Sequence, residues 1–335
     1  MEHTVTYLET GSQNPYYNLA FEEYVLTHYL EGDYLLLWQN DNTIVIGQNQ
    51  NTEAEINRAF VEEHGINVVR RGTGGGAVYH DLGNLNYSFI SDSDGIDHAA
   101  LERFAQPIVR ALKALGVDAE TSGRNDILAE GRKVSGTAQR KFKHRILHHG
   151  TLLFDSNPGM VAGALQVDPE KLKAKGTQSV RSRIGNIRDF LKEDMDLPAF
   201  WEYLKTALAG DGMVQATLSA EELAEIEELK RTKYDTWEWN YGRSPRYELH
   251  NKRRYTGGGL EVFLTANQGV IQDIVFYGDF LSLRSLDELR EALKGCAYRT
   301  EDVAAVLDRF PLHEFFGSIT REEVLDLVFH AVEKE

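Results

Sequence analysis

The chain has 335 residues, more than a single hydrophobic core usually covers, so its length favours one large domain and one smaller domain. With 42% hydrophobic and 26% charged residues, it has the composition of a globular protein rather than of a disordered one. The formal net charge of −16 argues against a nucleic-acid partner, because clustered lysine and arginine side chains supply most of the affinity for a phosphate backbone.

The start of the chain and its apolar runs give no sign of a membrane partner. Residues 1–4 lack the basic and apolar regions of a secretory signal, and no run of about 18 apolar residues occurs anywhere. We therefore expect a cytoplasmic protein. Cys296 is the one cysteine, which excludes an intrachain disulfide and a cysteine-based zinc cage.

Turn residues and apolar periodicity divide residues 14–69 into short elements. Asn14 and Pro15 are an N-cap and a first helical residue, and aromatic residues follow at helical spacing. Two apolar runs joined by four polar residues are typical of a hairpin, and a later helical pattern ends at Gly65. The predicted elements are a helix from Pro15, a hairpin of strands 34–38 and 43–46, a helix over 54–64 and a strand over 66–69.

The segment from Arg70 to Asn84 reads Arg-Arg-Gly-Thr-Gly-Gly-Gly-Ala-Val-Tyr-His-Asp-Leu-Gly-Asn. Residues 77–80 and 86–90 alternate as strands do, around the tight turn 81–84. Each glycine costs about 0.5–1 kcal/mol relative to alanine in a regular element, so we expect a ligand to approach this backbone closely. Bare amide groups can reach phosphate or carboxylate oxygens, and the two arginines add fork-shaped donors. A bulged strand or a turn is the alternative interpretation.

The same segment contains a literal dinucleotide-binding pattern between Gly72 and Ala77. That pattern must open a helix in a dinucleotide-binding fold, whereas residues 77–90 alternate like strands. The phosphate-loop pattern that ends in Gly-Lys-Ser or Gly-Lys-Thr is absent from the chain as well. Any phosphate site in this protein must therefore use another architecture.

The remainder of the chain indicates an α+β fold in two parts. The aromatic-rich, proline-terminated stretch 237–245 interrupts the pattern and predicts a domain boundary. The other predicted elements are a helix over 99–115, strands at 126–128, 133–135 and 150–154, a helical region over 197–229, paired strands at 260–264 and 270–277, and helices beyond them. We predict a large domain over residues 1–245, with a mixed, mostly antiparallel sheet and flanking helices, and a small C-terminal α+β accessory domain over residues 246–335.

A carboxylate and a lysine stand close together in the middle of the chain. Asp126 ends the run Gly-Arg-Asn-Asp, and Lys133 begins the run Lys-Val-Ser-Gly-Thr-Ala. If the two runs form neighbouring strands, a carboxylate that could hold Mg²⁺ and a lysine that could neutralise an α-phosphate converge. An exposed aspartate in a turn and a surface lysine are the alternative.

Histidines accompany these motifs. His148 and His149 are adjacent, so on a strand they point to opposite faces and cannot ligate one metal ion together. One of the two imidazoles could face a pocket as a hydrogen-bond donor, or it could be a core histidine with its own partner. His80 could either contact a ligand or brace Asp81.

Two further segments combine cations with glycines. Residues 171–186 are basic and contain two glycines, so they could fold over an anionic ligand as a lid or remain a solvated loop. Arg253 to Gly259 repeats the arginine–glycine pattern of residues 70–76, but no His-Asp pair follows it. We expect this second copy to be a coincidence or the glycine-rich start of a strand, and not a second site.

In this order, the motifs resemble those of the lipoate-protein ligase A family over nearly the whole chain. The family pattern R-R-x-x-G-G-G-x-V-x-H-D-x-G-N is met at every required position between Arg70 and Asn84. A second pattern, K-x-x-G-x-A followed by H-H-G, is met by Lys133 to Ala138 and by residues 148–150. The family's small C-terminal domain is similar to residues 237–335, including the stretch around Cys296.

The resemblance implies a two-step reaction that uses ATP, Mg²⁺ and (R)-lipoate. Lipoate and MgATP would give lipoyl-AMP and pyrophosphate, and the lipoyl group would then form an amide with a lysine of an acceptor protein. Lys133 would be the catalytic residue of the large domain, bridging the acyl carbonyl and the α-phosphate. The implied nucleotide contacts are Arg71, Gly76, Ala77, Val78, Tyr79, Asn125, Asp126 and Lys133, and the implied acyl contacts are Arg70, Gly75, His80, Lys133 and His149. Asp126 would also hold Mg²⁺, and the lid would contain Lys175, Ser179 and Arg181.

Two expectations about the ligand and the domains accompany the resemblance. The dithiolane and its carbon tail need an apolar slot, which we expect near Leu19, Val45 and Tyr79. We also expect the C-terminal domain to move between adenylation and transfer, because the predicted boundary could act as a hinge. The implied acceptors are lipoyl domains of 2-oxoacid dehydrogenase E2 subunits and the glycine-cleavage H protein or an H-like protein, and the ligase would act as a monomer.

Three other functions are weighed against this one. An ATP-independent octanoyl or lipoyl transferase of the same superfamily needs an activated thiolate beside the acyl pocket, and Cys296 is far in sequence from every site motif. Biotin-protein ligase is disfavoured because its G-R-G-R-x-x-R-x-W-x-S pattern is absent. A non-enzymatic lipoate-binding protein would keep the pocket and lose the ATP-dependent step.

Overall fold

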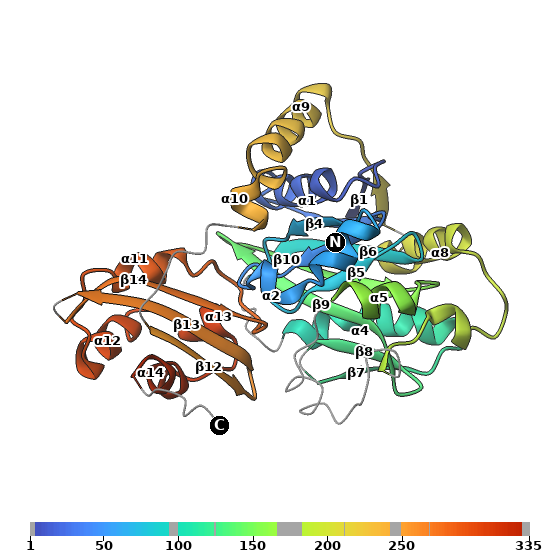
Figure 1. Cartoon of the computed structure of the whole chain (residues 1–335). Helices are drawn as coiled ribbons and strands as arrows, with labels where there is room; N and C mark the ends of the chain where they lie inside the picture. The colour runs from blue at the N-terminus through green and yellow to red at the C-terminus, as the bar shows by residue number, and fades with distance from the viewer. Residues whose placement is uncertain are drawn as a thin grey trace.

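The computed structural model describes residues 4–93, 100–123, 125–165, 183–210, 212–241, 249–267 and 269–329. It divides into a large α+β part and a smaller C-terminal part, which Figure 1 shows side by side. Among the described residues, no helix has the length and apolar character that crossing a membrane requires.

An eight-stranded sheet organises the large part. Its strand order is β11 (Met213–Gln215), β1 (Val5–Glu9), β2 (Asp33–Trp38), β6 (Asn84–Asp92), β10 (Arg145–Leu153), β9 (Arg132–Phe142), β8 (Asp126–Ala129) and β7 (Ala119–Ser122). β1 runs parallel to both of its neighbours, and the other pairs are antiparallel. The predicted mixed, mostly antiparallel sheet is therefore confirmed.

A second, three-stranded sheet has the order β4 (Asn67–Arg70), β3 (Thr43–Ile46) and β5 (Val78–His80). β2 pairs with β1 and β6, whereas β3 pairs with β4 and β5, so the predicted hairpin of residues 34–38 and 43–46 is wrong. Both runs are buried central strands with two long-range partners each, and short apolar runs carry no information about such partners. β5 and β6 likewise flank a tight turn but belong to different sheets.

Helices cover both faces of the large sheet. On one face, α4 (Ala100–Ala114) and α8 (Leu197–Ala209) pack Leu112 and Phe200 against strand residues such as Leu35. On the other face, α1 (Pro15–His28) packs with the small sheet, and the Asn14 side chain caps this helix as predicted. α9 (Ala220–Leu229), the π-helical turn η2 (Lys230–Tyr234) and α10 (Trp237–Asn240) continue this layer.

The predicted helix over 54–64 is in fact two short helices, α2 (Thr52–Glu55) and α3 (Arg58–Glu63). Ile56 leaves the helical path to form a β-bridge with Leu165, and the Asn57 side chain then caps the start of α3. With α5 (Pro158–Ala164), these helices close the outer face of the small sheet. The helical region predicted over 197–229 is also interrupted, by β11.

The C-terminal part has its own core. β12 (Leu249–Tyr255), β13 (Gly258–Asn267) and β14 (Val270–Gly278) form an antiparallel sheet, so the predicted pairing of 260–264 with 270–277 is confirmed. Its helices are α11 (Asp287–Leu293), α12 (Thr300–Leu307), α13 (Leu312–Phe316) and α14 (Arg321–Phe329). The described core residues of this domain all follow residue 248, and those of the large domain all precede residue 242. The predicted boundary at 245/246 lies outside the described residues and stays a prediction.

Candidate active site

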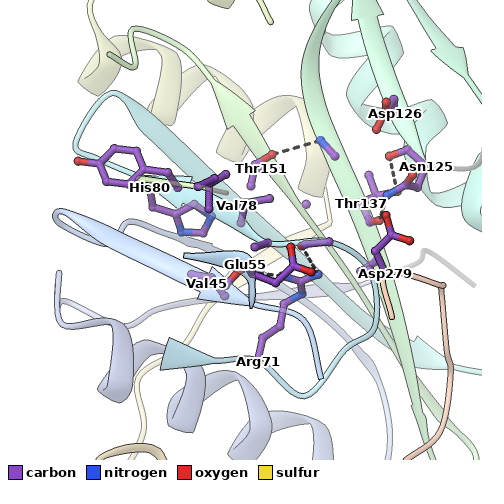
Figure 2. Close-up of a pocket in the computed structure, with 18 of the residues that line it drawn as sticks. Val45, Glu55, Arg71, Val78, His80, Asn125, Asp126, Thr137, Thr151 and Asp279 are labelled. Carbon is purple, nitrogen blue, oxygen red and sulfur yellow. Dashed lines mark hydrogen bonds between the residues drawn. The ribbon is translucent and has the colours of Figure 1, made fainter. Parts of the chain in front are cut away.

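Side chains from both parts of the chain line one cavity of about 580 Å³. Figure 2 shows Val45, Val78 and His80 on one side of it and Asn125, Asp126 and Asp279 on the other, with Arg71 between them. Of the residues that the motifs predict, the lining includes Arg71, Gly75, Gly76, Ala77, Val78, Tyr79, His80, Asn125, Asp126, Lys133 and His149. Leu19 and Val45, where we expected an apolar slot, line it too. The predicted lid residues Lys175, Ser179 and Arg181 lie outside the described residues.

The glycine loop, residues 72–76, connects β4 to β5 and passes between two other pieces of backbone. A Cβ built at Gly47 would lie 2.0 Å from the carbonyl oxygen of Gly75, and one at Gly74 would lie 2.5 Å from the amide nitrogen of Ser282. Gly75 also has a φ of +96°, which a side chain rarely permits. The protein's own backbone therefore makes the close approaches at Gly74 and Gly75, where the glycines predicted a ligand. Gly75 and Gly76 still line the cavity.

Arg71 is a buried cation that shapes the glycine loop from inside. Its guanidinium donates to the carbonyl oxygens of Val45 (3.2 Å), Gly74 (2.7 Å) and Gly76 (2.9 Å) and to the Thr73 hydroxyl (2.8 Å). Burial lowers the pKa of Arg71 to about 10, so the group is still charged at neutral pH. A fixed positive charge therefore lies directly behind the loop and faces the cavity.

Arg70 has a different place from the one predicted. It is not among the cavity-lining residues, and its side chain is turned toward the segment 47–52 and α10. It donates hydrogen bonds to the carbonyl oxygens of Gly47, Gln48, Gln50, Trp239 and Asn240 and to the Thr52 hydroxyl. The five N–H donors of a guanidinium are thus occupied by the protein itself, which favours a structural role for Arg70 over contact with an acyl group.

Lys133 and Asp126 meet at the polar end of the cavity, as expected for neighbouring strands. Asp126 on β8 lies opposite Gly136 on β9, and the Lys133 Nζ is 2.7 Å from the Asp126 Oδ1. Arg183 reaches the other oxygen of this carboxylate at 2.6 Å. A Cβ at Gly136 would lie 2.9 Å from the Lys133 Nζ, so the glycine of the K-x-x-G pattern leaves space for the lysine to fold back across its own strand.

His149 belongs to a buried chain of hydrogen bonds that begins at Glu22. The Arg71 Nε donates to the Thr73 hydroxyl, and that hydroxyl can then donate to the Nε2 of His149 (2.8 Å). The Nδ1–H of His149 is thereby directed at the Glu22 carboxylate, which lies 2.8 Å away and also accepts from Ser88 (2.5 Å). Glu22 was not predicted, because a single acidic residue on a helix shows no local sign of burial.

His80 is fixed in one tautomer by its neighbours. The Asn18 amide donates to the Asn40 Oδ1 (2.9 Å), so the Asn40 amide nitrogen faces the Nδ1 of His80 (3.1 Å) and must donate to it. His80 therefore carries its proton on Nε2, a buried atom that has no hydrogen-bond partner among the described residues. Burial, Arg71 and His149 lower the pKa of His80 to about 3. A neutral imidazole N–H thus lies at the apolar end of the cavity, and Asn40 rather than Asp81 orients it.

His148 points to the opposite face of β10, as predicted for adjacent histidines on a strand. It is buried against the Phe104 ring (5.2 Å between ring centroids), and its Nδ1 lies 3.0 Å from the Gln139 amide. Burial, with a smaller effect from His149, lowers the pKa of His148 to about 3. One of the two histidines therefore faces the cavity, and the other is a core residue.

Acid is expected to destabilise the protein through the buried neutral histidines. Unfolding returns the pKa of His148 from about 3 to its ordinary value, so the unfolded chain binds the extra proton as the pH falls below about 6.5. The contribution of His148 to the free energy of unfolding is fully present above that pH. Well below it, each such histidine lowers the free energy of unfolding by about 1.4 kcal/mol per pH unit. The free energy of unfolding should be measured with urea between pH 6.5 and 4.5. His148→Phe should reduce its slope against pH by up to this amount. Equal slopes for the variant and the wild type would contradict this assignment.

Two family models match the chain. One is described as the lipoyl protein ligase A/B catalytic domain and matches residues 14–209. The other is described as the bacterial lipoate protein ligase C-terminus and matches residues 244–328. The chain belongs to the lipoate-protein ligase family.

Individual members of the lipoate-protein ligase family match over almost the full chain. Lipoate-protein ligase LplJ of Bacillus subtilis is 43% identical, covering 94% of this chain and 97% of the relative. Among solved structures, P. falciparum LipL1 in complex with lipoate has a TM-score of 0.78 at 26% identity, covering 96% of this chain and 97% of that one. The chain therefore shares the fold of that ligase over almost its whole length.

Two further lipoate-protein ligase structures match about three quarters of the chain. A lipoate-protein ligase A bound with ATP has a TM-score of 0.62 at 30% identity, covering 72% of this chain and 99% of that one. A bipartite lipoate protein ligase from Thermoplasma acidophilum, described together with its E2 lipoyl domain, has a TM-score of 0.64 at 31% identity, covering 74% and 100%.

Proposed function

We propose that this ligase activates lipoate with ATP to give lipoyl-AMP and pyrophosphate, and then transfers the lipoyl group to a specific lysine of an acceptor lipoyl domain. The observation that carries the proposal is the cavity itself, whose apolar end and cationic end meet beside Lys133. A similar structure in complex with lipoate and another bound with ATP support the choice of these two substrates.

The apolar end suits the dithiolane and the carbon tail of lipoate. Leu19, Trp38 and Val45 contribute apolar side chains there, next to the Nε2–H of His80. A long apolar tail in this slot would direct its carboxylate toward the glycine loop and Lys133. Holding the carboxylate beside the α-phosphate converts a bimolecular encounter into an attack within one complex.

In the first step, a lipoate carboxylate oxygen would attack the α-phosphorus of ATP, and the bond to the bridging oxygen of pyrophosphate would break. Lys133 would neutralise the charge that develops on the α-phosphate. The positive charge of Arg71, fixed behind the glycine loop, would stabilise the same developing charge. In the second step, the acceptor amine would attack the acyl carbonyl, lose a proton and expel AMP. The same lysine contact would stabilise the departing phosphate.

A magnesium ion would accompany the ATP phosphates. Among the described residues, no group of three or more histidine, cysteine, aspartate or glutamate side chains is arranged to hold a metal ion. The Asp126 carboxylate at the polar end, which Lys133 and Arg183 contact in this structure, would exchange one of these contacts for the cation. Phosphate oxygens and one or two carboxylates are the usual ligands of Mg²⁺ in nucleotide sites. Bound there, Mg²⁺ would supply further neutralisation of phosphate charge.

The alternative function is an ATP-independent octanoyl or lipoyl transferase, which would need a cysteine beside the acyl group. Cys296 follows α11 in the C-terminal part, where it packs against that domain's own core and donates to the Ala297 carbonyl oxygen. Burial raises the pKa of its thiol, which disfavours the reactive thiolate. Cys296 is also absent from the lining of the cavity, so the geometry favours the ATP-dependent reaction.

The acceptors would be lipoyl domains of 2-oxoacid dehydrogenase E2 subunits and the glycine-cleavage H protein or an H-like protein. The relative described with its E2 lipoyl domain supports the first class. The acceptor lysine must reach the acyl carbonyl beside Lys133, and the C-terminal sheet forms one wall of that space. Movement of this domain between the two steps therefore stays part of the proposal.

The proposed function is tested by ATP–pyrophosphate exchange with lipoate, octanoate and biotin assayed in parallel. Exchange is expected with lipoate and absent with biotin, and octanoate would report how closely the slot discriminates between tails. Acyl transfer to a lipoyl domain without lipoate-dependent exchange would instead identify the transferase. Lipoate binding with neither exchange nor transfer would identify a binding protein.

A further inference from the structure

The second arginine–glycine motif, Arg253 to Gly259, lies at the wall of the active-site cavity. β13 begins at Gly258, so the predicted glycine-rich start of a strand is confirmed. Lys252 and Arg254 at the end of β12 and Gly259 at the start of β13 line the same cavity as Arg71 and Lys133. The motif is thus no separate site: its Arg254, with Lys252 just before the motif, adds cations to the described one.

Strand alternation places these cations on the face of the C-terminal sheet that its helices do not cover. Leu260, Val262 and Leu264 of β13 point into the core formed with the helices, so Gly259 and Glu261 belong to the opposite face. On β12, Arg254 pairs with Gly259 and Lys252 pairs with Glu261. The open face of the sheet is therefore the one that closes the cavity.

Arg254 is held in place at this wall by Asp279 and Gly259. The Arg254 Nη2 lies 3.3 Å from the Asp279 Oδ2, and the other oxygen of Asp279 accepts from the Gly259 amide at 2.7 Å. A Cβ at Gly259 would meet the Arg254 Nη1 at 3.3 Å, so the missing side chain lets the guanidinium lie across β13. The Arg254 side chain is 18% exposed, which keeps part of the fork available to the cavity.

The cations of the large domain that line the cavity already have protein partners, so a further cation could bind the outer phosphates of ATP. Lys133 and Arg183 share the Asp126 carboxylate, and the Arg71 guanidinium already donates to loop carbonyls. ATP brings several negative charges beyond the α-phosphate, and its leaving group departs with them. In the described lining of the cavity, Lys252 and Arg254 are the cations that the C-terminal wall adds. The 3.3 Å contact to Asp279 is long for a charged pair, so a phosphate oxygen can compete for the fork.

We propose that Arg254 binds the β- and γ-phosphates of ATP and stabilises pyrophosphate as it leaves, with Asp279 as its positioning residue. The proposal rests on the function proposed above. When the carboxylate attacks and the α–β phosphoanhydride bond breaks, the electron pair goes to the pyrophosphate oxygen, and Arg254 neutralises that charge. The C-terminal domain thereby takes part in adenylation. Transfer from lipoyl-AMP involves no pyrophosphate and does not need Arg254.

The test separates the two half-reactions in the full-length enzyme. Arg254→Ala is expected to raise the KM for ATP in lipoate-dependent pyrophosphate exchange by about 10- to 100-fold, the effect of losing a charged hydrogen bond. The rate of transfer from synthetic lipoyl-AMP to an apo lipoyl domain should stay within about twofold of wild type, because this step involves no β- or γ-phosphate. Arg254→Lys should recover part of the loss, because it keeps the charge without the fork.

Arg253→Ala is the matched control, because Arg253 is the neighbour on the other face of β12 and pairs with Asp326 on α14. It should leave both half-reactions unchanged. An unchanged KM for ATP in Arg254→Ala overturns the proposal, and so does an equal loss in both half-reactions, which indicates a disturbed domain. Absence of exchange in the wild-type enzyme would instead refute the proposed function, and this role with it.

Discussion

Replacing Lys133 with alanine is expected to lower the rate of lipoyl-AMP formation by about 10²- to 10³-fold, which is the usual effect of removing one preorganised charge from a transition state. The amine lies 2.7 Å from Asp126 at the polar end of the cavity, where the α-phosphate would be bound. The fold should survive, because Arg183 still pairs with the Asp126 carboxylate at 2.6 Å. Pyrophosphate release with lipoate and ATP measures the effect.

The control for Lys133→Ala is Lys143→Ala, in the exposed turn at the far end of β9. That variant should match the wild type in both pyrophosphate release and thermal unfolding. If Lys133→Ala released pyrophosphate at the normal rate, Lys133 would be removed from the proposed mechanism. If it also unfolded at a much lower temperature, the loss of activity would report the fold and not the chemistry.

The site could be predicted best where strand pairing brings neighbouring segments together. Asp126 and Lys133 lie on adjacent strands joined by a short turn, so their approach follows from local pattern alone. The opposite faces taken by His148 and His149 follow in the same way from the alternation of a strand. Both predictions depend on geometry that repeats every two residues, which a sequence shows directly.

The parts that could not be predicted depend on partners distant in the chain. Glu22 becomes a buried carboxylate because His149 and Ser88, far along the sequence, supply its hydrogen bonds. The apolar runs at 34–38 and 43–46 fail as a hairpin because their partners are β1, β6, β4 and β5. Hydrophobic pattern shows that a strand is buried, but not which strands lie beside it.

The glycine loop was predicted from the close approach of a ligand, but the C-terminal domain also requires its glycines. Three consecutive glycines do indicate close approach to backbone, and Gly75 and Gly76 face the cavity. Gly74 is nevertheless required by Ser282, and the Gly75 amide donates to the Phe280 carbonyl oxygen at 3.0 Å. The loop that is proposed to hold the nucleotide is therefore also a docking surface for the C-terminal domain. A shift of that domain would act on the loop directly.

The two arginines before this loop are predicted by the same motif, yet the structure gives them different surroundings. Replacing Arg70 with methionine is expected to destabilise the folded protein by about 3–5 kcal/mol, as for other buried charged groups whose partners are left unsatisfied. The carbonyl oxygens of Gly47, Gln50 and Asn240 would lose their charged donor without gaining water. Urea unfolding at neutral pH measures the loss.

Arg110→Met, on the exposed side of α4, is the matched control for Arg70→Met and should change the free energy of unfolding by less than about 0.5 kcal/mol. The two outcomes for Arg70 have separate meanings. A destabilised variant whose folded fraction keeps a normal KM for lipoate supports a structural role, in which Arg70 fixes the segment 47–52 and α10 against β4. A variant of normal stability with a raised KM for lipoate would return Arg70 to the acyl-binding role that the sequence implied, because only direct contact with the ligand would produce that combination.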